Sequence, residues 1–540
     1  MQQKISLKLL PIDAGNNSSI LESIAQTTGA RLEDISGYHL LKKSIDARGK
    51  TVWVNLTVNA FIKERFYQRE LQRFDFKDVS NSSKKVVIIG GGPAGIFSAL
   101  QLIERGIKPI ILERGKEVRA RRRDLATLNK EGIINPESNY CFGEGGAGTY
   151  SDGKLYTRST KRGDINRILS LFVHFGADEN ILYEAHPHIG TNKLPAIITA
   201  MRKRIIDCGG EFHFGKKVVD FIIGKDKIKS VKTSDGDFVH GDSFILATGH
   251  SARDIFILLH KKNIEIAAKG FALGVRIEHP QELINSIQYG RSNSLENNLP
   301  PASYSLVEQV EGRGVFSFCM CPGGIIAPAS TQENELVVNG WSPSKRNNPF
   351  ANSGMVVQVE KEDIIKSMGN GHPDSYRETM DNNSPLLMME FQKLIEQKAF
   401  HVGGGKFVAP AQRMVDFTEG RFSSSLPKCS YLPGIQSALL EEVLPPFIYQ
   451  RLKTAFKLFA KKMPSKNKHH GYFTNEAVLV ATESRTSSPV RIPRNEHSLH
   501  HPQIKNLYPC GEGAGYAGGI VSAAMDGERI ALASCFADTF

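Results

Sequence analysis

The chain lacks the features that mark secreted, membrane-spanning and disulfide-built proteins. Its 540 residues include seven cysteines and no CxxC pair, which is typical of free thiols in a reducing compartment. No apolar run approaches the roughly 18 residues of a membrane helix. The first residues also lack the basic start and apolar segment of a secretory signal. We therefore expect a cytoplasmic protein without a membrane span.

The sequence also lacks the patterns that mark nucleic-acid-binding and metal-binding sites. Lysine and arginine number 68 against 56 acidic residues, for a net charge of +12, but they are dispersed and show no aromatic interleaving of a nucleic-acid module. The histidine pairs at 469–470 and 500–501 lack the spacing of metal ligands. We predict no metal site, disfavour nucleic acid as a partner and expect a small-molecule substrate, with the oligomeric state open.

The length suits two to four domains at roughly 100–200 residues each. Residues 1–80 hold two alternating strand patterns, at 4–10 and 50–61, around a helical pattern at 18–29. They predict a small N-terminal α/β domain. A serine- and asparagine-containing stretch at 78–85 is typical of a linker.

A glycine-rich turn between a strand and a helix is the strongest motif. The apolar run KVVII at residues 85–89 is typical of a strand buried on both faces. GGGPAG at 90–95 follows at once and fits G-x-G-x-x-G, and residues 93–105 have helical spacing before a second strand at 108–112. Together they predict a complete βαβ dinucleotide-binding unit.

Each residue type in this unit has a physical role. Gly90 permits the tight turn, Gly92 lets backbone N–H groups approach a pyrophosphate, and Gly95 lets the helix pack on the strand. Glu113 ends the second strand and can accept hydrogen bonds from an adenosine ribose. The unit can hold FAD or NAD. The predicted contacts are Gly90, Gly92, Pro93, Ala94, Gly95, Glu113 and Arg114.

Two distant segments favour FAD. SFILATG at 243–249 and LYPCGEGAGYAGG at 507–519 resemble the segments that complete the flavin site in the two-dinucleotide-binding-domain flavoproteins of glutathione-reductase-like fold. In this resemblance Glu512 stands where the family usually has aspartate, and the helix after Gly519 points its N-terminus at the flavin. The glycine-rich loop at 142–155 is assigned to the diphosphate or the flavin face, with a mobile surface loop as the alternative. The contacts added here are Gly146, Val219, Thr248, Gly249, Gly511, Glu512, Gly519 and Ile520.

The segments at 142–155, 318–324, 407–413 and 510–520 together resemble bacterial FAD-dependent dehydrogenase-like proteins, commonly called NAD(FAD)-utilizing dehydrogenases. The resemblance covers nearly the whole chain. It implies FAD and an oxidoreductase activity, and it supplies no substrate.

Three side chains are candidates for catalysis. Lys154 can stabilise the flavin N1 or a substrate anion, or it can be a solvated lysine. Cys321 follows an alternating strand, so its thiol should share one face with that of Cys319, beside a flavin or simply packed in the core. Arg413 can clamp a substrate carboxylate or pair structurally. His250 and Arg253 can contact cofactor or substrate, with an interdomain salt bridge as the alternative for them.

We therefore predict an α/β fold class: a Rossmann-like FAD-binding domain (84–255 and 501–540), an inserted mixed α+β substrate or cap domain (256–500) and the small N-terminal domain. The expected function is an FAD-dependent oxidoreductase that transfers hydride to or from a small molecule. Because a second G-x-G-x-x-G is missing, reduction would come from the substrate itself or from NAD(P)H that docks directly at the flavin face. The alternatives are an NAD(P)H-dependent flavin monooxygenase and an FAD-bearing RNA-modifying or RNA-binding protein.

Overall fold

The computed structural model describes residues 1–157, 163–290, 298–369, 381–464 and 471–535. The N-terminal unit is a three-stranded antiparallel sheet in the order β1-β3-β2. Its strands are β1 (Gln2–Leu9), β2 (Ile35–Asp46) and β3 (Trp53–Ile62), and α1 (Pro11–Ala14) and α2 (Asn17–Thr28) accompany them. Ile20 and Ile24 of α2 pack against the sheet. The sequence pattern missed β2 because this edge strand is half-exposed along most of its length and shows no clean alternation.

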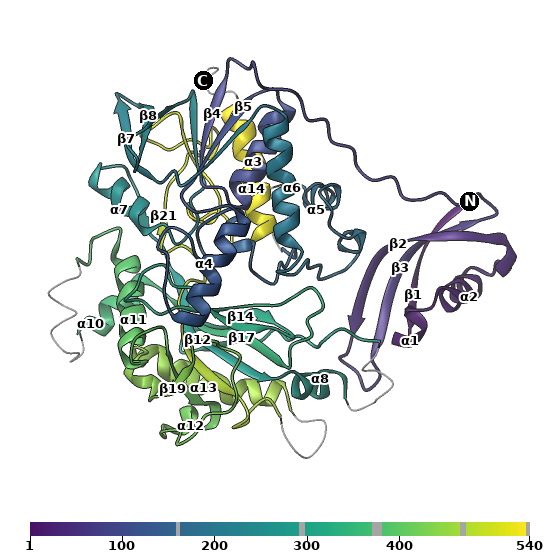
Figure 1. Ribbon diagram of the computed structural model, residues 1–540. Coiled ribbons are helices and arrows are strands. Elements are labelled where there is room, and N and C mark those ends of the chain that lie inside the picture. Colours follow the sequence, from purple (N-terminus) through teal and green to yellow (C-terminus); the bar gives the residue numbers. More distant parts are fainter. Residues whose placement is uncertain (158–162, 291–297, 370–380, 465–470, 536–540) are drawn as a thin grey trace.

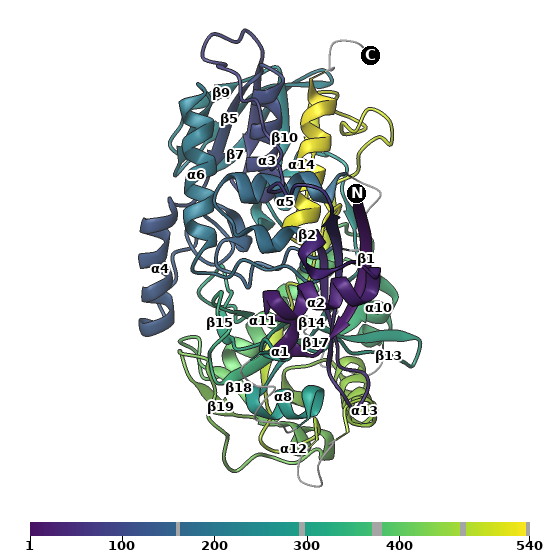
Figure 2. The ribbon, with the colours of Figure 1, turned by 90° about the vertical axis from the view of Figure 1, so that its right-hand side faces the viewer.

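The N-terminal unit stands beside the rest of the molecule (Figures 1 and 2). Residues 63–84 form no helix or strand and link it to the body. Phe74 and Phe76 of this link pack against the ring of His174. The edge of β2 also pairs with the body, since Lys43 N donates to Tyr183 O (2.8 Å) and Ala185 N donates to Lys43 O (2.9 Å).

A five-stranded sheet with parallel neighbours forms the upper part of Figure 1. Its order is β22-β10-β4-β5-β6, from β22 (Leu507–Pro509), β10 (Ser243–Leu246), β4 (Lys85–Ile89), β5 (Lys108–Glu113) and β6 (Glu211–Phe214). The C-terminal strand β22 thus joins strands that lie far earlier in the chain, as the resemblance implied.

This sheet is covered on both faces, because its strands are buried on both sides. Val86 and Ile88 of β4 pack into the helical layer, whereas Val87 and Ile89 face the opposite layer. The helical layer contains α3 (Pro93–Glu104), α5 (Ile165–His174), α6 (Leu194–Asp207) and α14 (Ile520–Ser534) (Figure 2). The opposite layer contains β7 (Val218–Gly224), β8 (Lys227–Thr233), β9 (Phe238–His240) and α7 (Arg253–Lys261). The predicted Rossmann-like α/β arrangement is confirmed.

The lower part of Figure 1 is built on a seven-stranded sheet in the order β13-β14-β17-β12-β20-β18-β19. Its strands are β12 (Phe271–Pro280), β13 (Val307–Val310), β14 (Arg313–Cys321), β17 (Phe350–Val359), β18 (Ala409–Arg413), β19 (Ile435–Ser437) and β20 (Val478–Glu483). The helices of this part are α8 (Gln281–Tyr289), α10 (Lys361–Gly369), α11 (Leu387–Val402), α12 (Met414–Glu419) and α13 (Pro446–Lys462). The largest apolar cluster of the described chain lies here.

The remaining elements are short or project from the body. They are α4 (Val118–Glu131), β11 (Ala267–Ala268), β15 (Ile325–Pro328), β16 (Val338–Trp341) and β21 (Val490–Arg491). No helix among the described residues has the length and apolar character needed to cross a membrane.

Candidate functional site

A cavity of about 750 Å³ lies where the parallel strands end. Gly90, Glu113 and Thr248 come at or just after the carboxyl ends of β4, β5 and β10 and line one side of it. Phe318 and Cys321 of β14, in the second sheet, line another side. Ligands of open α/β sheets bind at the carboxyl ends of the strands, so this cavity is the candidate site.

Most of the predicted site residues meet in this cavity. Its lining includes Gly90, Gly92, Pro93, Ala94, Glu113, Arg114, Gly146, Lys154, Thr248, Gly249, Cys321, Glu512, Gly519 and Ile520. Gly95, Val219, Gly511 and Arg413 are not lining residues. Val218 lines the cavity in place of its neighbour, and Val219 is 39% exposed.

Arg413 lies at the end of β18, and its side chain donates hydrogen bonds to two backbone oxygens. Its Nε donates to Ser425 O and its Nη1 to Asn475 O, each at 2.6 Å. The structure therefore does not bring Arg413 to the cavity, and its contacts are those of the structural pairing that the sequence left as the alternative to a substrate clamp.

The glycines of the first motif serve two different purposes. A Cβ on Gly95 would lie 2.0 Å from Gly90 O, and one on Gly90 would lie 2.4 Å from Ala247 O, so these two are demanded by packing of the protein itself. A Cβ on Gly92 would meet only Gly146 Cα, at 3.8 Å. Around Gly519, which lines the cavity directly before α14, there is open space. Glycine at these last positions leaves room for a ligand against the backbone, which fits a dinucleotide.

Two helix N-termini face the cavity together. Pro93 begins α3 and Ile520 begins α14, and both residues line the wall. The helices pack closely, because Ser98 Oγ in α3 contacts Gly527 O in α14 at 2.9 Å. The unpaired N–H groups and the positive dipole end of each helix favour negative charge. The arrangement suits a diphosphate and an electron-rich ring.

Glu113 holds three loops at the cavity wall. One carboxylate oxygen, Oε2, accepts from Gly91 N (2.8 Å), and the other, Oε1, accepts from Gly115 N (2.8 Å) and Gly143 N (3.0 Å). The side chain is only 5% exposed. The Glu113 carboxylate, which we expect to contact the ribose, therefore already has a structural role.

Arg121 is a residue whose role the sequence analysis missed. It is fully buried and donates to the carbonyls of Asn139 (2.9 Å), Tyr140 (3.0 Å) and Glu144 (2.8 Å), which precede or begin the glycine-rich loop. In the sequence it belongs to a basic run. Its helical register with Val118, Leu125 and Leu128, all buried, is the pattern that could have identified it.

The C-terminal motif is anchored by a second buried carboxylate. Asp526 of α14 accepts from Gly511 N (2.8 Å) and pairs with Arg494 (2.7 Å). The next residue in the motif, Glu512, lines the cavity. Burial raises the pKa of Glu512 to about 7, and the positive charge of Lys269 opposes this rise. Glu512 can therefore change protonation state near neutral pH.

The side of the cavity formed by β14 carries two thiols. Cys319 has a φ of 45°, and the register of β14 shifts between Phe318 and Cys321, so the strict alternation expected for the two cysteines is interrupted by a bulge. Both thiols nevertheless line the cavity. Arg276, fully buried and paired with Glu483 (2.9 Å), donates to Cys319 O (2.8 Å).

Lys154, Asp152 and Arg346 form a compact charged group on the same wall. Asp152 Oδ2 lies 2.6 Å from Arg346 Nη2 and 3.2 Å from Lys154 Nζ. Lys154 Nζ is also 3.8 Å from Cys321 Sγ. Burial would raise the pKa of Asp152, but the two cations outweigh it and lower this pKa to about 2.

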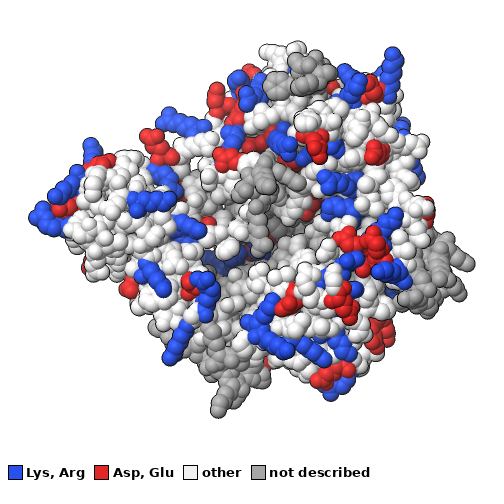
Figure 3. Space-filling model, turned by 180° about the vertical axis from the view of Figure 1, so that it is seen from behind, with Lys and Arg blue, Asp and Glu red and all other residues white. Residues whose placement is uncertain are grey.

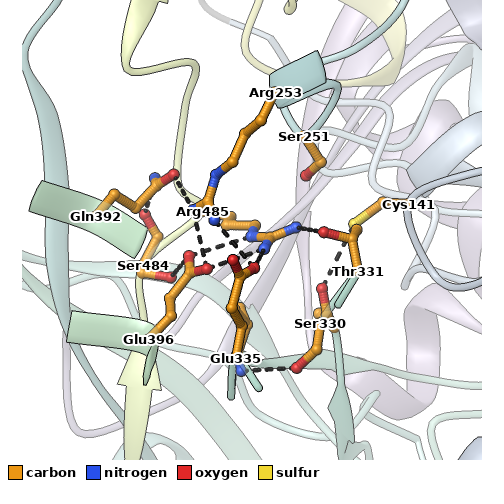
Figure 4. A network of polar contacts seen from close by, with 12 residues as sticks. Cys141, Ser251, Arg253, Ser330, Thr331, Glu335, Gln392, Glu396, Ser484 and Arg485 are labelled. Carbon is orange, nitrogen blue, oxygen red and sulfur yellow. Dashed lines mark hydrogen bonds and ion pairs between the residues drawn. The ribbon is translucent and has the colours of Figure 1, made fainter. Parts of the chain in front are cut away.

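A buried ion-pair network ties the two sheet regions together beside the cavity (Figure 4). Arg253 of α7 contacts Glu335 (3.0 Å) and Glu396 (2.9 Å), and Arg485 contacts the same two carboxylates at 3.0 and 2.9 Å. Arg253 thus makes the salt bridge between regions that the sequence offered as the alternative. His250 remains at the cavity wall, where burial lowers its pKa to about 4.

No group of three or more His, Cys, Asp and Glu side chains in the described residues is arranged to hold a metal ion. His500 Nδ1 lies 2.8 Å from the backbone oxygen of His501. The pair at 469–470 lies outside the described residues.

Comparison with known proteins places this site in a class. Residues 270–486 match the family "FAD-dependent protein, C-terminal domain-like", and residues 83–129 match the "FAD binding domain" family. Residues 1–61 match a domain of unknown function. The class is therefore that of FAD-dependent flavoproteins.

One relative matches this chain along nearly all of its residues. The chain is 38% identical over 546 residues to a protein of Clostridium beijerinckii described as "Uncharacterized protein", with 98% of each chain covered. The chain belongs to the family of this protein.

Two further similarities are partial or distant. The chain is 48% identical over 77 residues to the "Dual trans-enoyl reductase/FAD-dependent monooxygenase tazHJ" of Aspergillus terreus, covering 14% of this chain and 11% of that protein. The crystal structure of CtdE in complex with FAD is 9% identical, covers 85% of this chain and 84% of that one, and has a TM-score of 0.31.

Proposed function

We propose that this protein is an FAD-dependent oxidoreductase that oxidises or reduces a small organic substrate. The observation that carries the proposal is the single cavity that connects the glycine-lined helix ends with Lys154 and Cys321. Gly92, Glu113 and the start of α14 would hold the cofactor. The region built on the seven-stranded sheet would supply the substrate side, as expected for a substrate or cap domain at 256–500.

When bound, FAD would supply two-electron chemistry, and the protein would contribute binding, orientation and electrostatics. The N-termini of α3 and α14 favour negative charge beside them. Glu512 holds or releases a proton near pH 7, because burial raises its pKa to about 7. The ion pairs of Arg253 and Arg485 with Glu396 would hold α7 against α11, which would maintain the cavity between the two regions.

An anaerobic titration of the purified protein tests this function. The visible spectrum of bound flavin is recorded while NADH and then NADPH are added. We propose that NAD(P)H docks at the flavin face, so we expect the flavin absorption to bleach with one of the two. A protein that stays yellow would point to electrons from the organic substrate itself. A protein that cannot be loaded with FAD contradicts the proposed function.

A flavin monooxygenase is the second candidate. The local similarity to a protein named as an FAD-dependent monooxygenase favours it. It predicts NAD(P)H-dependent oxygen consumption that rises when the substrate is added, whereas a dehydrogenase would transfer electrons without incorporating oxygen.

An FAD-bearing RNA-binding protein is the remaining alternative. In Figure 3, lysine and arginine are interspersed with aspartate and glutamate over the visible face, which gives this alternative little support. Steep salt dependence of RNA binding would favour it.

A further inference from the structure

The cations around the cavity differ in how many acids they contact. For most of them, each cluster of ion pairs has at least as many carboxylates as cations. Arg114 and Lys217 share Glu137 and Asp254; Lys216 contacts Asp235 and Asp237; Arg485 and Arg253 share Glu335 and Glu396. These clusters carry no excess positive charge.

The group around Asp152 is the exception within the described residues of the cavity wall. Two cations, Lys154 and Arg346, share this one carboxylate. Two histidines are close, but they add no charge near pH 7: burial and the charge of Arg346 lower the pKa of His186 and of His188. The group therefore carries a net charge of about +1 at a cavity wall, where screening by bulk water is reduced.

Part of this positive group is free to bind. The side chain of Asp152 is 4% exposed, whereas that of Lys154 is 37% exposed. Arg346 uses Nε and Nη2 on Asp152, and its Nη1 has no hydrogen-bond partner in the part of the chain that the structure describes. One ammonium and one guanidinium nitrogen thus remain as charged donors.

Other polar groups of the cavity wall can also donate. Ser303 and Ser305 line the cavity with exposed side chains, and their hydroxyl groups make no hydrogen bond to other described residues. The carbonyl oxygen of the Asn339 side chain is used by Gly340 N (2.7 Å), which leaves its amide nitrogen to donate. Lys154 and Arg346 can only donate, so a ligand that satisfies them must offer acceptor oxygens, and a carboxylate offers two.

We propose that the substrate is an organic anion with one carboxylate, held through Lys154 and Arg346 at the end of the cavity formed by β14. The proposal rests on the proposed function, whose substrate class it names. A single excess charge matches a carboxylate better than a phosphate dianion, because burying a second negative charge without a partner is costly. Arg346 and Lys154 take the role of the carboxylate clamp that the sequence analysis assigned to Arg413.

Carboxylate binding to the FAD-loaded protein tests this site. The probes are acetate, benzoate and phenylacetate, each paired with its uncharged amide, and binding is followed by calorimetry and by the shift of the visible flavin spectrum. We expect at least one carboxylate to bind about tenfold or more tightly than its amide. Equal binding of acid and amide, or no carboxylate binding at millimolar concentration, would overturn the proposal.

Variants locate the effect. Lys154→Met and Arg346→Met should each weaken carboxylate binding about tenfold or more, while Lys154→Arg, which keeps the charge, should retain most of it. Lys345→Met is the matched control, because it removes an exposed lysine next to Arg346 in the chain that is not part of the cavity wall. We expect no change for it.

The remaining outcomes separate the possible errors. If Lys154→Met shifts the flavin spectrum without ligand and leaves carboxylate affinity intact, Lys154 serves the flavin and the anion site is refuted. If the protein cannot be loaded with FAD, the proposed function fails, and calorimetry with the same probes on the cofactor-free protein still decides whether the carboxylate site exists.

Discussion

The two ends of the cavity are built on different principles. At the end formed by the parallel sheet, glycines and helix N-termini make room for a ligand, and Glu113 is satisfied by three backbone N–H groups. At the end formed by β14, the wall is made of side chains, with two cations on one carboxylate. The first end thus presents backbone groups to a ligand, and the second presents charged side chains.

This difference predicts different roles in ligand binding for the two ends of the cavity. A backbone cradle is specific for the shape of a phosphate-bearing ligand and is insensitive to most side-chain changes. A charged side-chain group is specific for the sign and number of charges on its ligand. We therefore expect mutations at the first end to change cofactor retention and stability, and those at the second to change ligand choice.

The sharpest test compares two glycines three positions apart. Gly95→Ala places a Cβ 2.0 Å from Gly90 O, so we expect a loss of about 3 kcal/mol or more in the free energy of unfolding without FAD. Gly92→Ala meets only Gly146 Cα, at 3.8 Å, and should leave that stability nearly unchanged while weakening FAD binding. Urea denaturation and FAD titration of both proteins check this. Equal losses of unfolding free energy in the two variants would mean that Gly92, like Gly95, is required by packing of the protein itself.

The difference between the two ends of the cavity also explains which parts of the site could be predicted from the sequence. The turn at 90–95, Glu113 and the start of α14 at Ile520 were predictable, because each belongs to a local pattern of strand, turn and helix whose geometry follows from a few residues. The seven-stranded sheet and the Arg346–Asp152 pair depend on contacts between residues far apart in the chain. No local spacing encodes such pairs. The same limit led to Arg413 as the clamp, since a lone arginine carries no information about its partner.

Glu113→Gln tests whether the Glu113 carboxylate, at the parallel-sheet end of the cavity, stabilises the fold. The amide oxygen can still accept from two of the three backbone N–H groups, but its NH₂ would then face the third. We expect the free energy of unfolding without FAD to fall by about 2 kcal/mol, because a buried donor loses its acceptor. The exposed Glu131→Gln is the control. Unchanged stability together with weaker FAD binding would mean that Glu113 acts on the ribose alone.

Asp152→Asn tests the charge at the other end by pH. The folded-state pKa of Asp152, about 2, lies below its ordinary value of 3.8, so its ion pairs stabilise the protein above pH 3.8 and this stabilisation is lost as the pH falls toward 2. Between pH 5 and pH 3 the natural protein should lose about 1 kcal/mol more stability than the variant. Urea denaturation at the two pH values measures the difference. Parallel losses in both proteins would show that Asp152 is not held by these cations.

Cys321→Ser should have the smallest effect. It tests whether the Cys321 thiol contributes to function beyond the charges of Lys154 and Arg346. Cys321 is 1% exposed, and its Sγ contacts Cys319 O (3.1 Å) and Arg276 Nη2 (3.6 Å). A serine hydroxyl can replace both contacts, so we expect a stability loss below about 1 kcal/mol and unchanged carboxylate affinity, flavin spectrum and turnover. Cys319→Ser, at the exposed neighbouring thiol, is the matched control. Lost turnover with intact ligand binding in Cys321→Ser alone would give the thiol a chemical role beside the positive group, because packing and charge would both be preserved.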